Sequence, residues 1–187
     1  GLPDTVVVAK DIAGQVAGMP IYQLLGGACH DRIRVYADGF FRGATPTPES
    51  YREKAAAAVA QGFTALKLDV DDFLTPGARK VLIRCHGDAL GRGIANAEVR
   101  RVEESVAAIR EHLGPEVDLA LDCHWAFDLP GALRLGRALE PYHLMWFEDP
   151  IPSGNLAALA RLASELSVPI CIGEALCTRF QFREVFE

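Results

Sequence analysis

The sequence predicts an α/β fold in which strands and helices alternate and build a parallel sheet. Short apolar stretches have the length and residue types of buried strands, and helical patterns separate them. An acid directly follows three of these stretches, at Asp122, Glu148 and Glu174, and the two gaps are equal (148 − 122 and 174 − 148 are both 26). One strand, one helix and two short loops fill such a repeat. Parallel strands joined in this way form right-handed βαβ units.

The first elements are defined by helix stop and start signals. An apolar helix over residues 4–17 is ended by Gly18, and residues 32–40 are predicted to form strand one. Thr47 and Pro48 supply an N-cap and a first-turn proline for a helix through residue 60. Strand two is expected over 63–70, and residues 71–94 are expected to form a loop over the site.

The second half repeats the alternation. Asn96 is expected to cap a helix that runs to Leu113 and ends at Gly114-Pro115. The remaining elements are predicted as strand 117–121, helix 131–139, strand 144–147, helix 156–166, strand 168–173 and a last helix from 179.

A (β/α)8 barrel of the TIM type is favoured over a doubly wound open sheet. An open nucleotide-binding sheet should show a glycine-rich motif after its first strand, but residues 38–43 match neither GxGxxG nor GxxxxGK. Barrel active sites lie at the C-terminal ends of the strands, where the three acids fall. A barrel usually takes about 250 residues, so we expect a partial barrel with strands 1–5 over 32–187, preceded over 1–31 by a helix and loop.

Composition excludes several classes of protein. With 187 residues, half of them apolar, the chain can bury a core, and its net charge of −6 offers no basic face to nucleic acid. No apolar run is long enough to span a membrane, so a cytoplasmic protein is expected. The five cysteines form no CxxC, and we expect reduced, packed thiols, Cys123 and Cys171 included.

Asp122, Glu148 and Glu174 are candidate metal ligands. If their strands are neighbours, about 4.8 Å apart, the three carboxylates converge, and hard oxygen ligands suit Mg²⁺. The alternative is that each acid only caps the helix that follows its strand.

Four short motifs carry a resemblance to a known family. They are Lys67-Leu68-Asp69, Asp122-Cys123-His124, Glu148-Asp149-Pro150 and Gly173-Glu174. In this order they resemble the enolase superfamily, in its mandelate racemase/muconate lactonizing enzyme branch, and residues 173–179 are more similar to sugar-acid dehydratases of the galactonate and mannonate type than to racemases. The resemblance implies that an N-terminal capping domain and strands six to eight are absent from the chain.

The resemblance also implies a chemistry. Mg²⁺ held by the three acids would stabilise an enediolate formed when the proton α to a carboxylate is removed, and Lys67 would add a second positive charge. His124 would be the general acid that protonates the departing hydroxyl, so that a sugar acid becomes a 2-keto-3-deoxy acid. Asp69 stands where many relatives have a base lysine, so the base is expected beyond Glu187.

Alternatives remain open. A racemase, epimerase or cycloisomerase would use the same metal site, and a metal-binding fragment that is inactive alone is a third possibility. Asp149 could hold a metal ligand in place or cap the next segment, and Arg179 could meet an anionic substrate or be an exposed helix arginine. Expected partners are a small-molecule carboxylate and a second copy of the chain in a homo-oligomer, with no nucleic acid and no membrane.

Overall fold

The computed structural model describes residues 2–70, 73 and 93–187, and most of the predicted loop 71–94 lies outside the described residues. The chain divides into two compact units, one of residues Val35–Gly173 and one of residues Gly1–Arg34 with Glu174–Glu187. The domain prediction of 1–31 and 32–187 stays a prediction.

The larger unit is a parallel sheet covered by helices. Its elements are β1 (Ala37–Asp38), α3 (Pro48–Ala60), β2 (Ala65–Asp69), α5 (Asn96–Leu113), β3 (Asp118–Asp122), α6 (Leu129–Leu139), the short 3₁₀ helix η2 (Glu140–Tyr142), β4 (Trp146–Glu148), α7 (Leu156–Glu165) and β5 (Ile170–Cys171). The smaller unit contains α1 (Leu2–Ala17), α2 (Ile21–Leu24) and α8 (Arg179–Phe186).

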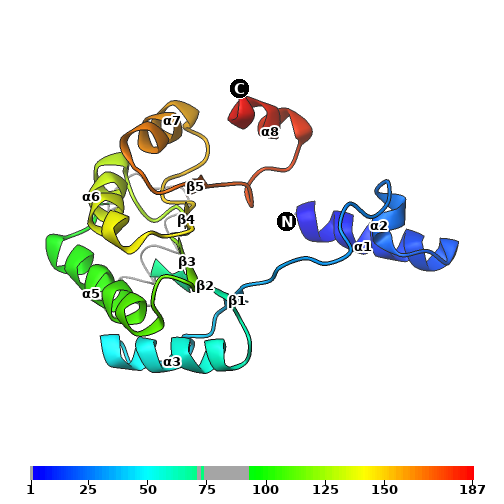
Figure 1. Cartoon of the computed structure of the whole chain (residues 1–187). Helices are drawn as coiled ribbons and strands as arrows, with labels where there is room; N and C mark the ends of the chain where they lie inside the picture. Colours follow the sequence, from blue (N-terminus) through cyan, green and yellow to red (C-terminus); the bar gives the residue numbers. More distant parts are fainter. Residues whose placement is uncertain (1, 71–72, 74–92) are drawn as a thin grey trace. The chain divides into compact units, whose positions relative to one another are not determined.

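The strand order confirms the barrel type. All neighbouring strands are parallel, and the order across the sheet is β1-β2-β3-β4-β5, the same as along the chain. A doubly wound sheet would reverse its strand order at a switch point. Helices α3, α5, α6 and α7 follow one another along the outside of the sheet (Figure 1), and each packs against the next. This is the succession found around part of a (β/α)8 barrel.

The core lies between the sheet and these helices. Successive residues of a strand point to opposite faces, and alternate strand residues form the core on the helix side: Leu66, Leu68, Leu119, Leu121 and Phe147, each fully buried. The residues between them occupy the opposite face. That face contains the polar residues of the strands, and the core therefore fixes which way they point.

Several element boundaries differ from the predictions. Strand one was expected over 32–40, but β1 is limited to Ala37 and Asp38, which pair with β2, and Ile33 and Val35 are mostly exposed. A strand forms only where a neighbour supplies hydrogen-bond partners, and apolar composition does not reveal that length. Strands β2, β3, β4 and β5 fall within or next to their predicted ranges but are shorter or shifted by one or two residues.

Two helix starts are corrected. Ala95, not Asn96, is the N-cap of α5, and the Glu98 carboxylate accepts a hydrogen bond from the Ala95 backbone N–H at 2.9 Å. Helix α6 begins at Leu129, two residues earlier than predicted, because Asp128 caps it by accepting from the Gly131 N–H at 2.7 Å. Elsewhere the predicted Thr47 cap of α3 is confirmed. None of the helices in the described residues is long and apolar enough to cross a membrane.

Candidate active site

The strand register stacks polar residues in two layers on the inner face of the sheet. In the last layer, at the C-terminal ends of the strands, Asp69 pairs with Asp122 and Asp122 pairs with Glu148. In the layer below, Lys67 pairs with Ala120, which pairs with Trp146. Two of the three predicted metal ligands, Asp122 and Glu148, are thereby neighbours. Glu174 belongs to the smaller unit and stays a predicted third ligand.

The Lys67 side chain extends from the lower layer to two of the predicted metal ligands, Asp122 and Glu148. Its Nζ lies 2.9 Å from Asp122 Oδ2 and 3.3 Å from Glu148 Oε1, and the residue is only 7% exposed. It also lies over the Tyr36 ring, 5.7 Å from the centroid. Burial alone would lower the pKa of Lys67, but the hydrogen bond to Asp122 and the charges of both carboxylates outweigh it and raise the pKa above its usual value. Lys67 is therefore a cation in the metal-free site at neutral pH.

The turn after β3 positions His124. Both His124 and Trp125 have positive φ angles, 47° and 56°, which are uncommon for residues other than glycine. The neighbouring turn holds them in place, since the Trp125 N–H donates to the Asp149 carbonyl at 2.6 Å. Asp149 also has a positive φ of 40°, and its N–H donates to the Cys171 carbonyl at 2.9 Å. Strained backbone thus follows the ends of two neighbouring strands, β3 and β4.

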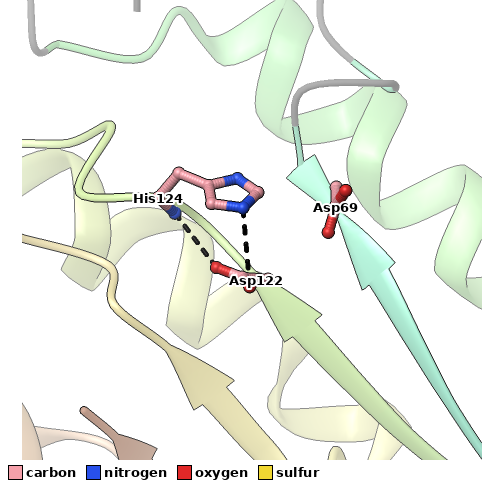
Figure 2. A group of neighbouring side chains, drawn as sticks. All are labelled: Asp69, Asp122 and His124. Atoms are coloured by element: carbon pink, nitrogen blue, oxygen red, sulfur yellow. Dashed lines mark hydrogen bonds and ion pairs between the residues drawn. The ribbon is translucent and has the colours of Figure 1, made fainter. Parts of the chain in front are cut away.

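Figure 2 shows the result of this turn: the His124 imidazole lies over the end of β3, directed at Asp122. The backbone N–H of His124 donates to Asp122 Oδ1 at 3.1 Å, and His124 Nε2 lies 3.6 Å from Asp122 Oδ2. About a third of the side chain is exposed (35%). An imidazole in this place contacts the predicted metal ligand and remains open to solvent on one side.

Asp69 completes a cluster with these two residues. Ligand atoms of Asp69, Asp122 and His124 all lie within 4.8 Å of one another, and Figure 2 shows Asp69 at the end of β2 beside the imidazole. Burial raises the pKa of Asp69 from 3.8 to about 6, with the His124 charge opposing the rise and the Asp122 charge adding to it. The carboxyl of Asp69 can therefore titrate near neutral pH.

Trp146 is a site residue that the sequence analysis missed. Its indole Nε1–H donates to Glu148 Oε2 at 2.9 Å, and its ring meets the Tyr36 ring edge-on, with centroids 5.6 Å apart. The period of two along a strand could have revealed it, because Trp146 precedes Glu148 by two positions and must share its face.

The remaining candidates lie in different surroundings. Asp149 is fully buried after β4, and its role at the site stays a prediction. Arg179 is exposed in α8, with its guanidinium over the Phe180 ring at 5.0 Å, and its contact with a substrate stays a prediction. Cys123 is buried in the core, as expected for a packed thiol, and Cys171 is partly buried.

Comparisons with known proteins agree with the fold and identify the family. The family model described as enolase C-terminal domain-like matches residues 50–187. D-xylonate dehydratase from Haloferax volcanii is 32% identical over 182 residues, which cover 97% of this chain and 42% of that protein. D-galactonate dehydratase from Ralstonia nicotianae is 34% identical over 178 residues, which cover 95% of this chain and 41% of that protein.

Solved structures give the same result. The crystal structure of a mandelate racemase/muconate lactonizing enzyme-like protein from Rubrobacter xylanophilus DSM 9941 is 42% identical with a TM-score of 0.75, over 95% of this chain and 46% of that one. The chain thus spans less than half the length of the relatives it matches. With the strand order, the carboxylates at the strand ends and these matches in agreement, the chain belongs to the enolase superfamily and contains part of the C-terminal barrel domain of the mandelate racemase/muconate lactonizing enzyme branch.

Proposed function

We propose that the protein is an Mg²⁺-dependent dehydratase of sugar acids, which removes the proton α to the substrate carboxylate and then eliminates the β-hydroxyl. The single observation on which this depends most is His124, an imidazole that lies against Asp122 while a third of it faces solvent. Relatives that cover nearly the whole chain are named D-xylonate, D-gluconate and D-galactonate dehydratases, which supports the substrate class.

The donor set fits a hard divalent cation. Asp122 Oδ2 and Glu148 Oε1 both face one cationic group, the Lys67 ammonium, so the site already places two carboxylate oxygens around positive charge. Asp122, Glu148 and Glu174 would hold Mg²⁺. When bound, the ion would bind the substrate carboxylate and stabilise the negative charge that develops as the α-proton leaves.

The chain's own residues would perform the remaining steps. The Lys67 ammonium attracts the substrate carboxylate and adds charge stabilisation to the enediolate. His124 then donates a proton to the β-hydroxyl, the bond from carbon to oxygen breaks, and water leaves with that proton. The resulting enol takes up a proton at the β-carbon and becomes a 2-keto-3-deoxy acid. Asp69, beside His124, stands where many relatives have a base lysine, so a different group would take the α-proton.

A racemase or cycloisomerase is the second candidate, since the 42% identical solved structure is described as mandelate racemase/muconate lactonizing enzyme-like. The two candidates differ in whether a hydroxyl leaves, and thus in whether an acid such as His124 is needed.

His124→Asn separates the candidates. The protein expressed from its whole reading frame is incubated in D₂O with D-xylonate, D-gluconate or D-galactonate and followed by NMR. For a dehydratase, the wild type releases a 2-keto-3-deoxy acid, and the variant loses elimination by at least about a hundredfold while still exchanging the α-proton for deuterium. Epimerisation by the wild type without a keto product would favour the second candidate, and elimination unaffected by the substitution would refute the role of His124.

A further inference from the structure

The two ligand carboxylates at the ends of β3 and β4 are held in the same manner. In each, one oxygen accepts a hydrogen bond from a donor on its own segment: Asp122 Oδ1 from the His124 backbone N–H at 3.1 Å, and Glu148 Oε2 from the Trp146 indole at 2.9 Å. The other oxygen of each, Oδ2 of Asp122 and Oε1 of Glu148, faces the Lys67 ammonium. Each carboxylate therefore turns one oxygen toward positive charge, while its other oxygen accepts a hydrogen bond from an uncharged N–H group.

Two neighbours surround the Trp146 donor. Its neighbour across the sheet in the same layer is Ala120, whose small side chain leaves room for an indole. The Tyr36 ring meets the indole edge-on at 5.6 Å. The indole N–H is a donor only, so it cannot turn around to offer an acceptor. Glu148 is longer than Asp122 and has one more rotatable bond, and the indole compensates for that freedom.

We propose that Trp146 is a positioning residue that fixes Glu148 as a one-oxygen ligand and so makes the site selective for Mg²⁺ over Ca²⁺. The inference rests on the proposed metal site. Mg²⁺ requires near-octahedral coordination, which one oxygen from each carboxylate allows, whereas Ca²⁺ accepts more ligands and readily takes both oxygens of a carboxylate. The hydrogen bond from the indole holds Oε2 of Glu148 in a fixed direction and takes up one of its lone pairs, which disfavours the two-oxygen mode.

The test measures Mg²⁺ and Ca²⁺ binding by titration calorimetry on the whole protein, without substrate. Trp146→Phe retains a ring against Tyr36 and removes the donor. We expect its Kd for Mg²⁺ to rise at least about tenfold, the usual effect of removing a hydrogen bond to a metal ligand, and its Kd for Ca²⁺ to stay within about threefold or fall. A second variant carries benzothienylalanine at position 146 only, which replaces the indole N–H by sulfur without changing the shape, and it should behave in the same way.

Tyr142→Phe is the matched control, because it also removes an aromatic donor from a glutamate (Tyr142 Oη to Glu103 Oε1, 3.4 Å) but lies ahead of β4, at the other end of the strand. It should change neither Kd. Unchanged Mg²⁺ binding in both position-146 variants, or an equal loss for both ions, would overturn the role of Trp146. Failure of the wild type to bind Mg²⁺, or binding unaltered by Glu148→Gln, would instead reject the metal site itself.

Discussion

Replacing Lys67 by methionine tests whether the lysine and the metal share the same two carboxylates. Methionine has a similar length and no charge, so Asp122 and Glu148 would remain close together without a cation between them. Removing one partner of a buried ion pair costs about 3–5 kcal/mol. We take the lower end, about 3 kcal/mol, because the Glu148 side chain is 14% exposed and keeps some solvation.

The assay is urea unfolding at pH 8 in EDTA and again in saturating Mg²⁺. The raised pKa of Lys67 means that its stabilisation is complete below the unfolded value of 10.5 and is lost only as the pH rises above it, so pH 8 measures the full effect. Without the ammonium, the carboxylates should bind Mg²⁺ at least about tenfold more tightly. In saturating Mg²⁺, the difference in the free energy of unfolding between the wild type and Lys67→Met should therefore be smaller than in EDTA by about 1.4 kcal/mol or more.

Lys54→Met supplies the comparison, since Lys54 is half-buried and its Nζ donates to one backbone carbonyl, that of Arg42, at 3.3 Å. Lys54→Met should lower the free energy of unfolding by less than about 1 kcal/mol, and by the same amount with and without Mg²⁺. If Lys67→Met were no more costly than this control, the buried charges would not need the ammonium. If its deficit were the same in EDTA and in Mg²⁺, the lysine and the ion would not compete for the same oxygens.

Three further substitutions test other parts of the structure by urea unfolding. Asp69→Asn should raise the free energy of unfolding of the metal-free protein at pH 7–8 by about 1–3 kcal/mol, because the pKa of Asp69 is raised from 3.8 to about 6 and its ionised form is costly in the folded state. The gain should decrease as the pH falls from about 6 and vanish at about pH 3, below the unfolded pKa, and a gain that persists there would contradict the assignment. Gly136→Ala should lower the free energy of unfolding by about 1–3 kcal/mol, because the new Cβ would collide with the Leu166 side chain, and this outweighs the helix preference of alanine. In a double-mutant cycle, Leu166→Ala should remove most of that penalty. Arg110→Lys should lower the free energy of unfolding by about 2 kcal/mol, because the guanidinium donates to the four backbone carbonyls of residues 114, 117, 142 and 143, and an ammonium cannot span them. An unchanged urea midpoint would refute this.

The sequence predicted the sheet and part of the site because both depend on short-range patterns. The period of two in β2 and β3 fixes which residues face the helices, and the equal spacing of the acids follows from one repeated βα unit. Once the strands are parallel and consecutive, Asp122 and Glu148 must end at the same edge. Lys67 was placed in a core strand for the same reason, and its burial confirms that prediction.

The rest depended on contacts between segments that no local pattern encodes. The left-handed turn at His124 and Trp125 is set by the Asp149 carbonyl, and neither residue type predicts a positive φ. The length of β1 depends on which residues of β2 face it, so the apolar residues Ile33 and Val35 led to a predicted strand that was too long. To predict the hydrogen bond from Trp146 to Glu148, one had to know that Trp146 pairs with Ala120 across the sheet and that its indole turns toward Glu148.

In the proposed dehydration, the acid at position 69 would determine how the two halves of the reaction are arranged. A lysine there would place a second ammonium beside His124 and repel the protonated imidazole that a general acid needs. Asp69 attracts that form instead, and its ligand atoms lie within 4.8 Å of those of His124. The end of β2 therefore suits an imidazole that gives a proton, and it offers no amine to take one. We expect the α-proton to leave toward a base elsewhere while the hydroxyl departs on the side of His124, so a variant that restores lysine at position 69 should weaken elimination even though it returns a potential base.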